Sequence, residues 1–281
     1  MKFVSYSIRG RTSFGLVCGD RVVDLKDRSG AASLKALIDD GGLERASAWA
    51  GETPDENLAD IVFEPVIGDP GKIICIGLNY ADHVAETGRT ATGEPTVFLR
   101  FADTQIGHGA PIPAPKPSGN VDYEGELAVI IGKGGRYIPE SEALGCIAGF
   151  ACYNDVSIRD FQRHTSQFTA GKNFPGTGPF GPFLVTPDEV GALGPQRIRT
   201  RLNGQVVQEA HLSQMIFPAP RLIAYISKWT KLSPGDVIVT GTPGGVGAAR
   251  QPPLWMKPGD VVEVEIDKVG LLKNPVAAEA S

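Results

Sequence analysis

The 281-residue sequence contains only four cysteines, and no two of them have the C-x-x-C spacing of a metal or redox motif. A chain of this length can bury a sizeable core without disulfides, so we expect reduced and mostly buried thiols. The sequence also shows no charged-then-apolar leader and no apolar run long enough to span a membrane. Together these absences predict a cytoplasmic protein without a membrane partner.

Blocks of basic residues are absent as well. With 27 lysines and arginines against 32 aspartates and glutamates the net charge is −5, which makes nucleic acid a poor partner. The loop 240–247 is rich in glycine but lacks the Lys-Ser/Thr of a phosphate loop, so we do not expect nucleotide binding. Because the chain is negatively charged overall, an anionic small molecule would bind only where a metal ion and nearby cationic side chains make the local electrostatic potential positive.

The first 68 residues have a pattern of their own. Residues 1–8 alternate polar and apolar side chains, and 13–25 predicts two short strands joined by a hairpin turn. The stretches 33–38 and 44–49 predict short helices. We therefore expect a small N-terminal α/β module over residues 1–68.

The larger remainder, 69–281, is dense in strand patterns. Leu222, Ile223 and Ile226 recur at helical spacing, so 219–231 predicts an amphipathic helix that covers a sheet. Strands outnumber helices without regular alternation, which argues against a doubly wound or TIM-barrel fold and predicts an α+β fold with a β-rich body. The strand patterns lie at 73–76, 96–99, 126–131 and 181–185.

Two carboxylates lie close together in the strand-like run 121–132. Glu124 and Glu126 are two residues apart and precede a continuous apolar run, so they would project from the same face of a strand. Such carboxylates repel each other unless a positive charge lies between them, and a hard cation such as Mg²⁺ or Mn²⁺ suits oxygen ligands. A solvated acidic edge is the alternative, and the pair taken alone favours it, because motif matches of this kind are often accidental.

A third carboxylate, Asp155, follows the apolar stretch 147–152 and precedes a predicted helix that begins near Val156. It could be an ordinary helix N-cap, a position in which aspartate is common. With Glu124 and Glu126 it would instead complete a set of three oxygen ligands. Such a set leaves positions open for water and substrate, as in catalytic magnesium sites.

His83 and Glu86 are three residues apart on a predicted helix, so they share one face. A carboxylate beside an imidazole raises its basicity and fixes its tautomer, as a general base requires. A surface pair without a role has the same spacing and stays an alternative. Two loops add Lys172 as a candidate for an oxyanion, and Thr242 with its loop N–H groups for a carboxylate.

Taken in order along the chain, these segments resemble one protein family. The segments are Gly77-Leu78-Asn79-Tyr80 with His83-x-x-Glu86, Pro95-Thr96-Val97-Phe98, Asp122-Tyr123-Glu124-Gly125-Glu126-Leu127, Asn154-Asp155 with Arg159-Asp160 and Gln162, Gly171-Lys172, and 240–247. This order resembles the fumarylacetoacetate hydrolase family, especially its shorter branch of acylpyruvate hydrolases and oxaloacetate decarboxylases. The resemblance covers about 72–270, and the Glu-x-Glu…Asp set with the Thr-Gly-Thr-Pro loop is its specific part.

The resemblance implies a β-roll-like body and, commonly, a homodimer, and it implies roles for residues by their position. The family's Mg²⁺ or Mn²⁺ carboxylates are matched by Glu124, Glu126 and Asp155. The catalytic positions are matched by His83 and Glu86, as the dyad that activates water, and by Lys172. The expected substrate-binding residues are Gln162 and Thr242, to which we add Arg100. The chain departs from the family over 173–178, a loop that borders the pocket, so the departure leaves the substrate open.

The function implied by this resemblance is metal-dependent hydrolysis of a carbon–carbon bond in a 2,4-diketo acid. The substrate would be of acylpyruvate type, from aromatic or sugar-acid catabolism. The metal would stabilise the departing enolate, and a water activated by His83 would attack the distal carbonyl. Decarboxylation of oxaloacetate or isomerisation of a 2-hydroxy-dienoate would suit the same site. A non-catalytic binding relative is a further alternative, against which the complete set of site residues argues.

Overall fold

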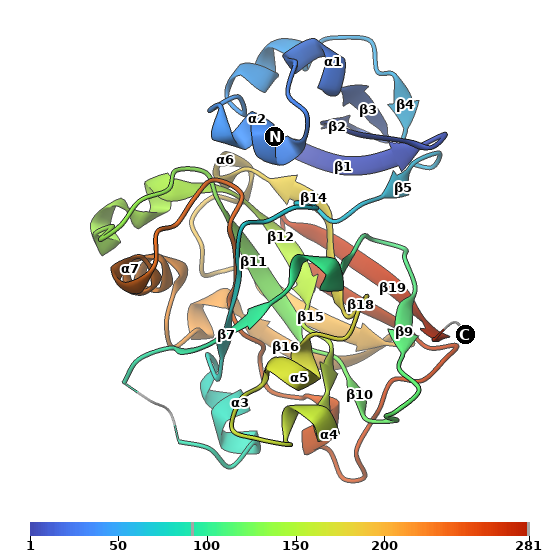
Figure 1. Cartoon of the computed structure of the whole chain (residues 1–281), viewed down its shortest axis with the longest axis vertical. Coiled ribbons are helices and arrows are strands. Elements are labelled where there is room, and N and C mark those ends of the chain that lie inside the picture. The colour runs from blue at the N-terminus through green and yellow to red at the C-terminus, as the bar shows by residue number, and fades with distance from the viewer. Residues whose placement is uncertain (91–92, 280–281) are drawn as a thin grey trace.

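The computed structural model describes residues 1–90 and 93–279 and contains many short strands and few helices (Figure 1). The strands are β1 (Lys2–Ile8), β2 (Arg11–Cys18), β3 (Arg21–Asp24), β4 (Glu56–Asn57), β5 (Val62–Phe63), β6 (Ile73–Gly77), β7 (Thr96–Arg100), β8 (Gln105–Ile106), β9 (Ile112–Ala114), β10 (Val121–Asp122), β11 (Gly125–Ile131), β12 (Ile147–Asn154), β13 (Ser157–Ile158), β14 (Gly178–Val185), β15 (Arg197–Leu202), β16 (Gln205–His211), β17 (Val237–Val239), β18 (Val261–Ile266) and β19 (Gly270–Ala278). The α-helices are α1 (Lys26–Ser29), α2 (Leu34–Asp39), α3 (Ala81–Glu86), α4 (Arg159–Gln162), α5 (Thr169–Lys172), α6 (Pro187–Val190) and α7 (Ala219–Trp229).

In the described part of the chain, twelve strands form one mixed sheet. Its order is β4-β3-β2-β1-β14-β12-β11-β17-β6-β7, with β5 beside β1 and β8 beside β14. A second sheet has the order β16-β15-β18-β19-β9, and β10 pairs with β13. The predicted α+β class is confirmed. None of the helices described is long and apolar enough to cross a membrane.

The N-terminal strands form a small lobe at one end of the molecule, drawn in blue in Figure 1. β1, β2 and β3 are antiparallel neighbours, and α2 begins where the Ser33 hydroxyl accepts the Ala36 N–H at 3.2 Å. The predicted helix at 44–49 is a 3₁₀ turn, Arg45–Trp49. Because β1 also pairs with β14, the lobe shares its sheet with the body, and the division after residue 68 stays a prediction.

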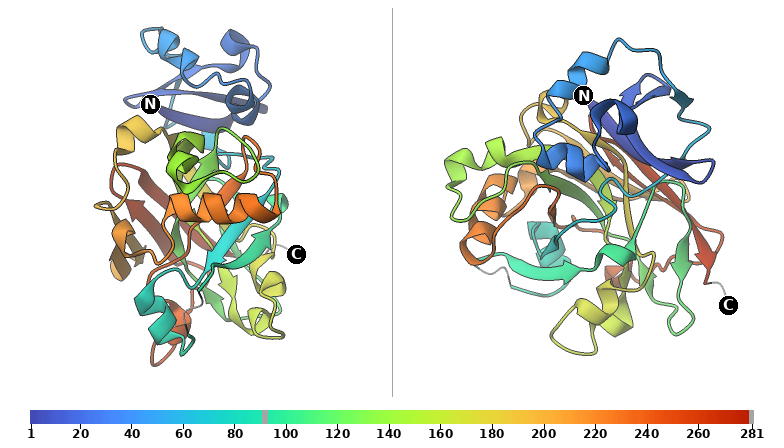
Figure 2. Two further views of the ribbon diagram at one scale, coloured as in Figure 1. Left: turned by 90° about the vertical axis from the view of Figure 1, so that its left-hand side faces the viewer. Right: turned by 45° about the horizontal axis from the view of Figure 1, so that its top comes forward.

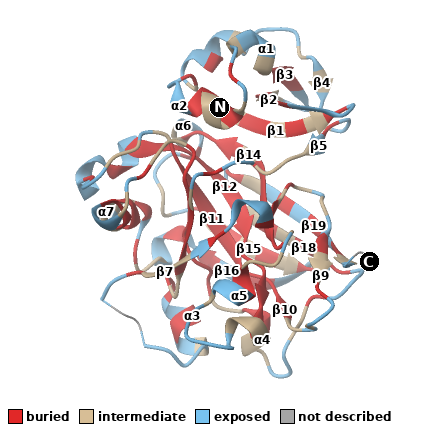
Figure 3. Cartoon of the chain, viewed as in Figure 1, coloured by how far each residue is buried: buried red, intermediate tan, exposed pale blue. Residues whose placement is uncertain are grey.

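β11 and β12 lie in the middle of the body, and every residue in both strands is buried (Figure 3). The side chains of β11 alternate between two cores. Leu127 and Val129 belong to one core, whereas Ala128 and Ile130 belong to the other. Burial on both faces explains why this strand reads as a continuous apolar run.

α7 packs on the first of these cores with Leu222, Ile223 and Ile226, all fully buried. It lies across the body in the left view of Figure 2. The helix predicted at 219–231 is therefore confirmed, although its last residue, Trp229, is 47% exposed. The buried side chains of α7 thus pack against one core of the body. The site lies instead at the ends of β11 and β12 that carry Gly125 and Asn154.

Candidate active site

The three predicted metal-binding carboxylates meet at the ends of two neighbouring strands. β11 and β12 pair antiparallel with Gly125 opposite Asn154. Glu124 therefore lies just before one strand and Asp155 just after the other, and the Asp155 N–H donates to the Glu124 carbonyl at 2.8 Å. Carboxylate oxygens of these two residues and Glu126 lie within 4.8 Å of one another, and all three residues are buried. A single cation can bind several carboxylate oxygens at once only when these oxygens lie this close together.

The single strand predicted over 121–132 is interrupted immediately before Gly125. β10 ends at Asp122 and β11 begins at Gly125. Between them the Glu124 N–H leaves the strand ladder and donates to the Asn154 side chain at 3.0 Å. The expectation of one regular strand was wrong at this point, and the two carboxylates nevertheless converge.

The helix predicted from Val156 begins later than expected. β13 intervenes, the helix α4 starts only at Arg159, and Ile158 occupies the N-cap position. Asp155 is therefore not a helix cap. Its carboxylate is instead directed to cationic side chains of the site.

Cationic side chains balance Glu124 and Asp155. Lys172 Nζ lies 2.6 Å from an oxygen of each carboxylate, and Arg159 Nη2 lies 2.6 Å from the other oxygen of Glu124. Burial alone would raise the pKa of Glu124, but Arg159 and Lys172 hold it well below its usual value. Burial also opposes the charge on Lys172, yet Asp155 and Glu124 raise its pKa, so it is an ammonium at neutral pH.

Glu126 has no cationic partner among the residues that the structure describes. It is 2% exposed and accepts the backbone N–H of Gly241. Burial, together with the nearby charges of Asp155 and Glu124, raises its pKa well above the ordinary value. A cation would stabilise this carboxylate in its ionised form, and three carboxylates are a hard donor set that fits a divalent ion. The residues present therefore fit a divalent metal, and burial excludes a solvated acidic edge.

His83 and Glu86 form the predicted pair on α3. His83 Nδ1 lies 2.7 Å from Glu86 Oε1, and Glu86 Oε2 accepts the Gly245 N–H at 2.7 Å. This second bond fixes the carboxylate, which holds the imidazole with Nε2 as its free nitrogen. His83 is only 7% exposed, so the pair is not an incidental surface contact.

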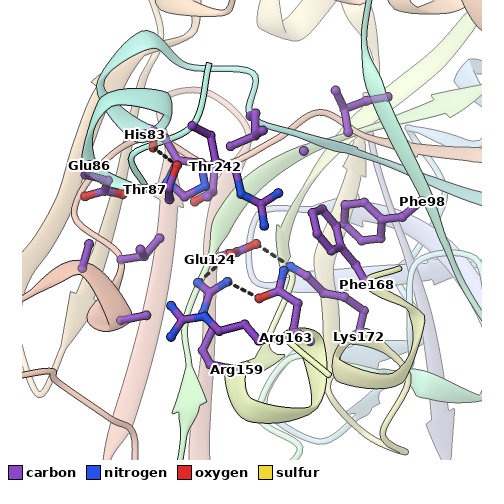
Figure 4. A pocket seen from close by; sticks show the side chains of 18 of the residues that line it. His83, Glu86, Thr87, Phe98, Glu124, Arg159, Arg163, Phe168, Lys172 and Thr242 are labelled. Atoms are coloured by element: carbon purple, nitrogen blue, oxygen red, sulfur yellow. Dashed lines mark hydrogen bonds and ion pairs between the residues drawn. The ribbon is translucent and has the colours of Figure 1, made fainter. Parts of the chain in front are cut away.

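A cavity of about 300 Å³ lies between this pair and the carboxylates. In Figure 4, His83 and Glu86 lie on one side, and Glu124 and Lys172 on the other. Phe98 and Phe168 form an apolar part of the wall, with ring centroids 5.6 Å apart. The predicted residues that line the cavity are His83, Glu86, Glu124, Glu126, Gln162, Lys172 and Thr242.

Arg100 occupies a different position from the other expected substrate-binding residues. It is 3% exposed, and its Nη1 lies 2.6 Å from Asp155 Oδ1 while its Nη2 donates to Thr177 at 2.7 Å. In the part of the chain that is described, it does not line the cavity. This position does not fit the expected contact with a substrate, and we propose instead that Arg100 holds Asp155 in place.

Thr242 lines the cavity, but its hydroxyl is already engaged. It donates to the Gly125 carbonyl at 3.0 Å and accepts from Gln208 Nε2 at 2.8 Å. Gln208 Oε1 accepts the Gly125 N–H at 3.0 Å, which fixes the end of the amide that faces Thr242. A substrate carboxylate would have to replace the bond to Gly125, and this role of Thr242 stays a prediction.

Three residues with clear contacts received no role from the sequence. Asp122 lies 2.7 Å from Arg159 Nε and accepts the N–H groups of Gly247 and Ala248 at 2.7 and 2.9 Å. Arg159 lies within a segment that carries the family resemblance, so its position was a usable signal. Gln208 lies on β16 in the second sheet without a motif around it, and only the tertiary structure reveals its contacts.

Known proteins with similar sequences cover most of the chain. The family model for the fumarylacetoacetate (FAA) hydrolase C-terminal region matches residues 72–277. The chain is also 40% identical over 275 residues to a Xenopus laevis protein named "Oxaloacetate tautomerase fahd2, mitochondrial". This match covers 95% of the chain and 86% of the relative.

Solved structures with similar folds span the full chain. A maleylpyruvate hydrolase from Sphingobium sp. SYK-6, in complex with manganese (II) ion and pyruvate, superposes with a TM-score of 0.84 at 28% identity, over 100% of both chains. A 5-carboxymethyl-2-hydroxymuconate delta-isomerase from Mycobacterium smegmatis superposes with a TM-score of 0.77 at 30% identity, over 99% of this chain and 100% of that one. Proteins that share this fold are therefore named for different reactions.

Proposed function

The chain belongs to the fumarylacetoacetate hydrolase family, and on this premise we propose that it interconverts the keto and enol forms of oxaloacetate in a divalent-metal-dependent reaction. One observation carries the proposal: His83 lines the same cavity as Glu124 and Glu126. A 2-oxo acid held at the carboxylates would present its C3 hydrogens to a fixed imidazole. The 40% identity to a protein named as an oxaloacetate tautomerase supports this substrate.

The residues Glu124, Glu126 and Asp155 would hold the cation. When bound there, a divalent ion polarises the 2-oxo group and so lowers the free energy needed to remove a C3 proton. Mg²⁺ and Mn²⁺ both suit three carboxylate ligands, and the similar maleylpyruvate hydrolase contains manganese. We propose that either ion supports the reaction.

His83 carries the proton in this scheme. Because Glu86 engages Nδ1, the free Nε2 removes a proton from C3 and returns it to the 2-oxygen. The Gly245 N–H holds Glu86, so the ring keeps its orientation while the proton moves. The imidazole therefore acts as base and then as acid without a change in the overall proton count.

Lys172 and Gln162 would support the same step from the opposite wall. Lys172 stays charged beside Glu124 and stabilises negative charge that develops on the substrate. The Gln162 side-chain oxygen accepts from Arg159 Nη1 at 2.9 Å, which leaves the amide NH₂ to donate to a substrate oxygen. Both residues thereby bind and orient the substrate.

The His83–Glu86 pair also favours a second function, hydrolysis of an acylpyruvate-type 2,4-diketo acid. His83 Nε2 would remove a proton from water, and the water oxygen would bond to the distal carbonyl carbon. The C3–C4 bond would then break, its electron pair would stay on C3 as an enolate, and the imidazolium would return its proton there. The products would be pyruvate and a second carboxylic acid.

A comparison of substrates with the Mg²⁺-loaded protein tests the proposal. The enol absorbance of oxaloacetate, the formation of pyruvate and the loss of acetylpyruvate absorbance are followed in parallel. We expect the enol to be lost far faster than it is spontaneously, without formation of pyruvate. EDTA should abolish this acceleration. Pyruvate formed from oxaloacetate would indicate decarboxylation, and a higher kcat/KM on acetylpyruvate would indicate hydrolysis. No turnover of either acid would refute both candidate functions and leave a binding relative.

A further inference from the structure

Two cationic side chains of the cavity take no part in the carboxylate site. Arg89 and Arg163 both line the cavity. Arg159 and Lys172, in contrast, each lie 2.6 Å from Glu124, so both belong to the carboxylate site. None of the ion pairs found among residues 1–90 and 93–279 involves Arg89 or Arg163. Two positive charges are therefore free to meet an anionic ligand.

These two arginines come from separate segments of the chain that border the cavity. Arg89 follows α3, and its backbone N–H donates to the Val84 carbonyl at 3.3 Å. Arg163 directly follows α4, and its N–H donates to the Arg159 carbonyl at 3.2 Å. Both residues are exposed, and Figure 4 labels Arg163 on the side of Arg159 and Lys172. Both guanidinium groups are therefore accessible to solvent and border the cavity.

Aromatic contacts hold the guanidinium of Arg89. Its Cζ lies 5.0 Å from the centre of the Phe168 ring, and Phe168 contacts Phe98 edge to face. The Phe98 ring lies in turn 5.0 Å from Lys172 Nζ. Two aromatic rings thus lie between Lys172, which is beside the metal-binding carboxylates, and Arg89. Stacking on a ring face leaves the edge N–H groups of a guanidinium free to bind an anion.

We propose that Arg89 and Arg163 bind the second carboxylate of a dicarboxylic 2-oxo acid, the one remote from the metal-binding residues. The proposal rests on the function above and assigns the residues that select a dicarboxylic substrate, because the acid group at each end of the ligand would meet positive charge. Guanidinium groups bind carboxylates through paired hydrogen bonds, which gives both affinity and orientation. A monocarboxylic acid would leave these two arginines unused.

Binding of malate and lactate to the Mg²⁺-loaded protein tests the proposal without turnover. Malate and lactate are stable 2-hydroxy acids that differ in the distal carboxylate alone. Their affinities are measured by calorimetry for the wild type, Arg89→Gln and Arg163→Gln. Arg9→Gln serves as the control, because Arg9 is exposed and lies in the N-terminal lobe. Thermal unfolding of each variant checks that it is folded.

We expect the wild type and the control to bind malate at least tenfold more tightly than lactate. Each cavity variant should lose about tenfold in malate affinity and keep its lactate affinity, as expected for the loss of one charged hydrogen-bonding partner. Equal affinities in the wild type, or equal losses for both acids in the variants, would overturn the proposal. A malate preference without oxaloacetate turnover would instead refute the proposed reaction and leave the carboxylate assignment standing.

Discussion

Glu124 and Glu126 are two residues apart, yet their surroundings differ. The contribution of each carboxylate to stability can therefore be told apart from its contribution to metal binding. Glu124 is bound by Arg159 and Lys172, whereas Glu126 accepts a backbone N–H. Removing one member of a buried ion pair leaves the other charge uncompensated and costs about 3–5 kcal/mol. Removing the charge of Glu126 relieves repulsion instead. The stability of the fold should therefore fall on substitution of Glu124 but not on the same substitution of Glu126.

In metal-free protein, Glu124→Gln should lower the free energy of unfolding by about 3 kcal/mol. Glu126→Gln should leave it unchanged or raise it, because the amide oxygen can still accept the Gly241 N–H. Urea unfolding in EDTA measures both values. Equal destabilisation by the two substitutions would contradict the charge distribution described for the site.

Replacement of His83 tests its role as the proton carrier. His83→Gln should lower kcat on the preferred substrate by about 10²–10⁴-fold, because general acid–base catalysis contributes this much. The affinity for Mn²⁺ should stay unchanged, since His83 is not one of the three carboxylates. His211→Gln is the matched control, because His211 is exposed and its ring bonds to the Pro195 carbonyl. An unchanged kcat would reject His83 as the base.

At the scale of single elements, β16 holds the glycine-rich loop against the start of β11. Gln208 on this strand bonds to the Gly125 N–H, the Thr242 hydroxyl and the Pro243 carbonyl. Gln208→Ala should destabilise the protein by about 1–3 kcal/mol, because buried polar groups lose their partners. Urea unfolding compares it with Gln205→Ala, an exposed residue of the same strand. A loss no larger than that of the control would show that β16 does not position the loop.

The first three strands depend on a buried carboxylate, Asp24 of β3. Its Oδ2 accepts the hydroxyl protons of Tyr6 and Ser13, each at 2.6 Å. Burial alone would raise the pKa of Asp24, but these two hydrogen bonds and Arg11 lower it. Because the folded pKa lies below the unfolded value of about 3.9, the carboxylate stabilises the fold above that pH. This contribution is lost as the pH falls through the folded pKa.

Asp24→Asn should therefore lower the free energy of unfolding at pH 7 by about 1–3 kcal/mol. The difference from the wild type should shrink as the pH falls below about 4, where the unfolded chain takes up this proton, until the folded carboxyl is protonated as well. Denaturant unfolding at several pH values in EDTA measures this, with the exposed Asp27→Asn as control. A difference that does not vary with pH would contradict the ionic role of Asp24.

For the whole molecule, local sequence patterns predict the longer buried elements, but they do not predict most of the short strands. The helical spacing of Leu222, Ile223 and Ile226 gives α7, and the alternation of residues 1–8 gives β1. These patterns are informative because the buried side chains of a helix or a strand recur in the sequence with the period of that element. The Glu124, Glu126 and Asp155 set needs the family's order of segments as well, because no local rule pairs the two strands that carry them.

Contacts between distant segments account for what the sequence does not predict. The contacts of Gln208 and the burial of Arg100 against Asp155 depend on how separate sheets and strands pack. The interruption before Gly125 depends on the side chain of Asn154, which comes from the neighbouring strand. The homodimer and the cytoplasmic location stay predictions, and the name of the Xenopus laevis relative places that protein in mitochondria.

The most direct test of the whole account is Mn²⁺ binding to metal-free protein, followed by the electron paramagnetic resonance signal of the free ion. The wild type should bind one ion per chain, and Glu126→Gln should weaken this binding by at least tenfold while it remains folded. The same ion should restore turnover to the EDTA-treated wild type. Undiminished Mn²⁺ binding by Glu126→Gln, or full turnover after EDTA, would contradict the central claim that these three buried carboxylates hold the catalytic metal.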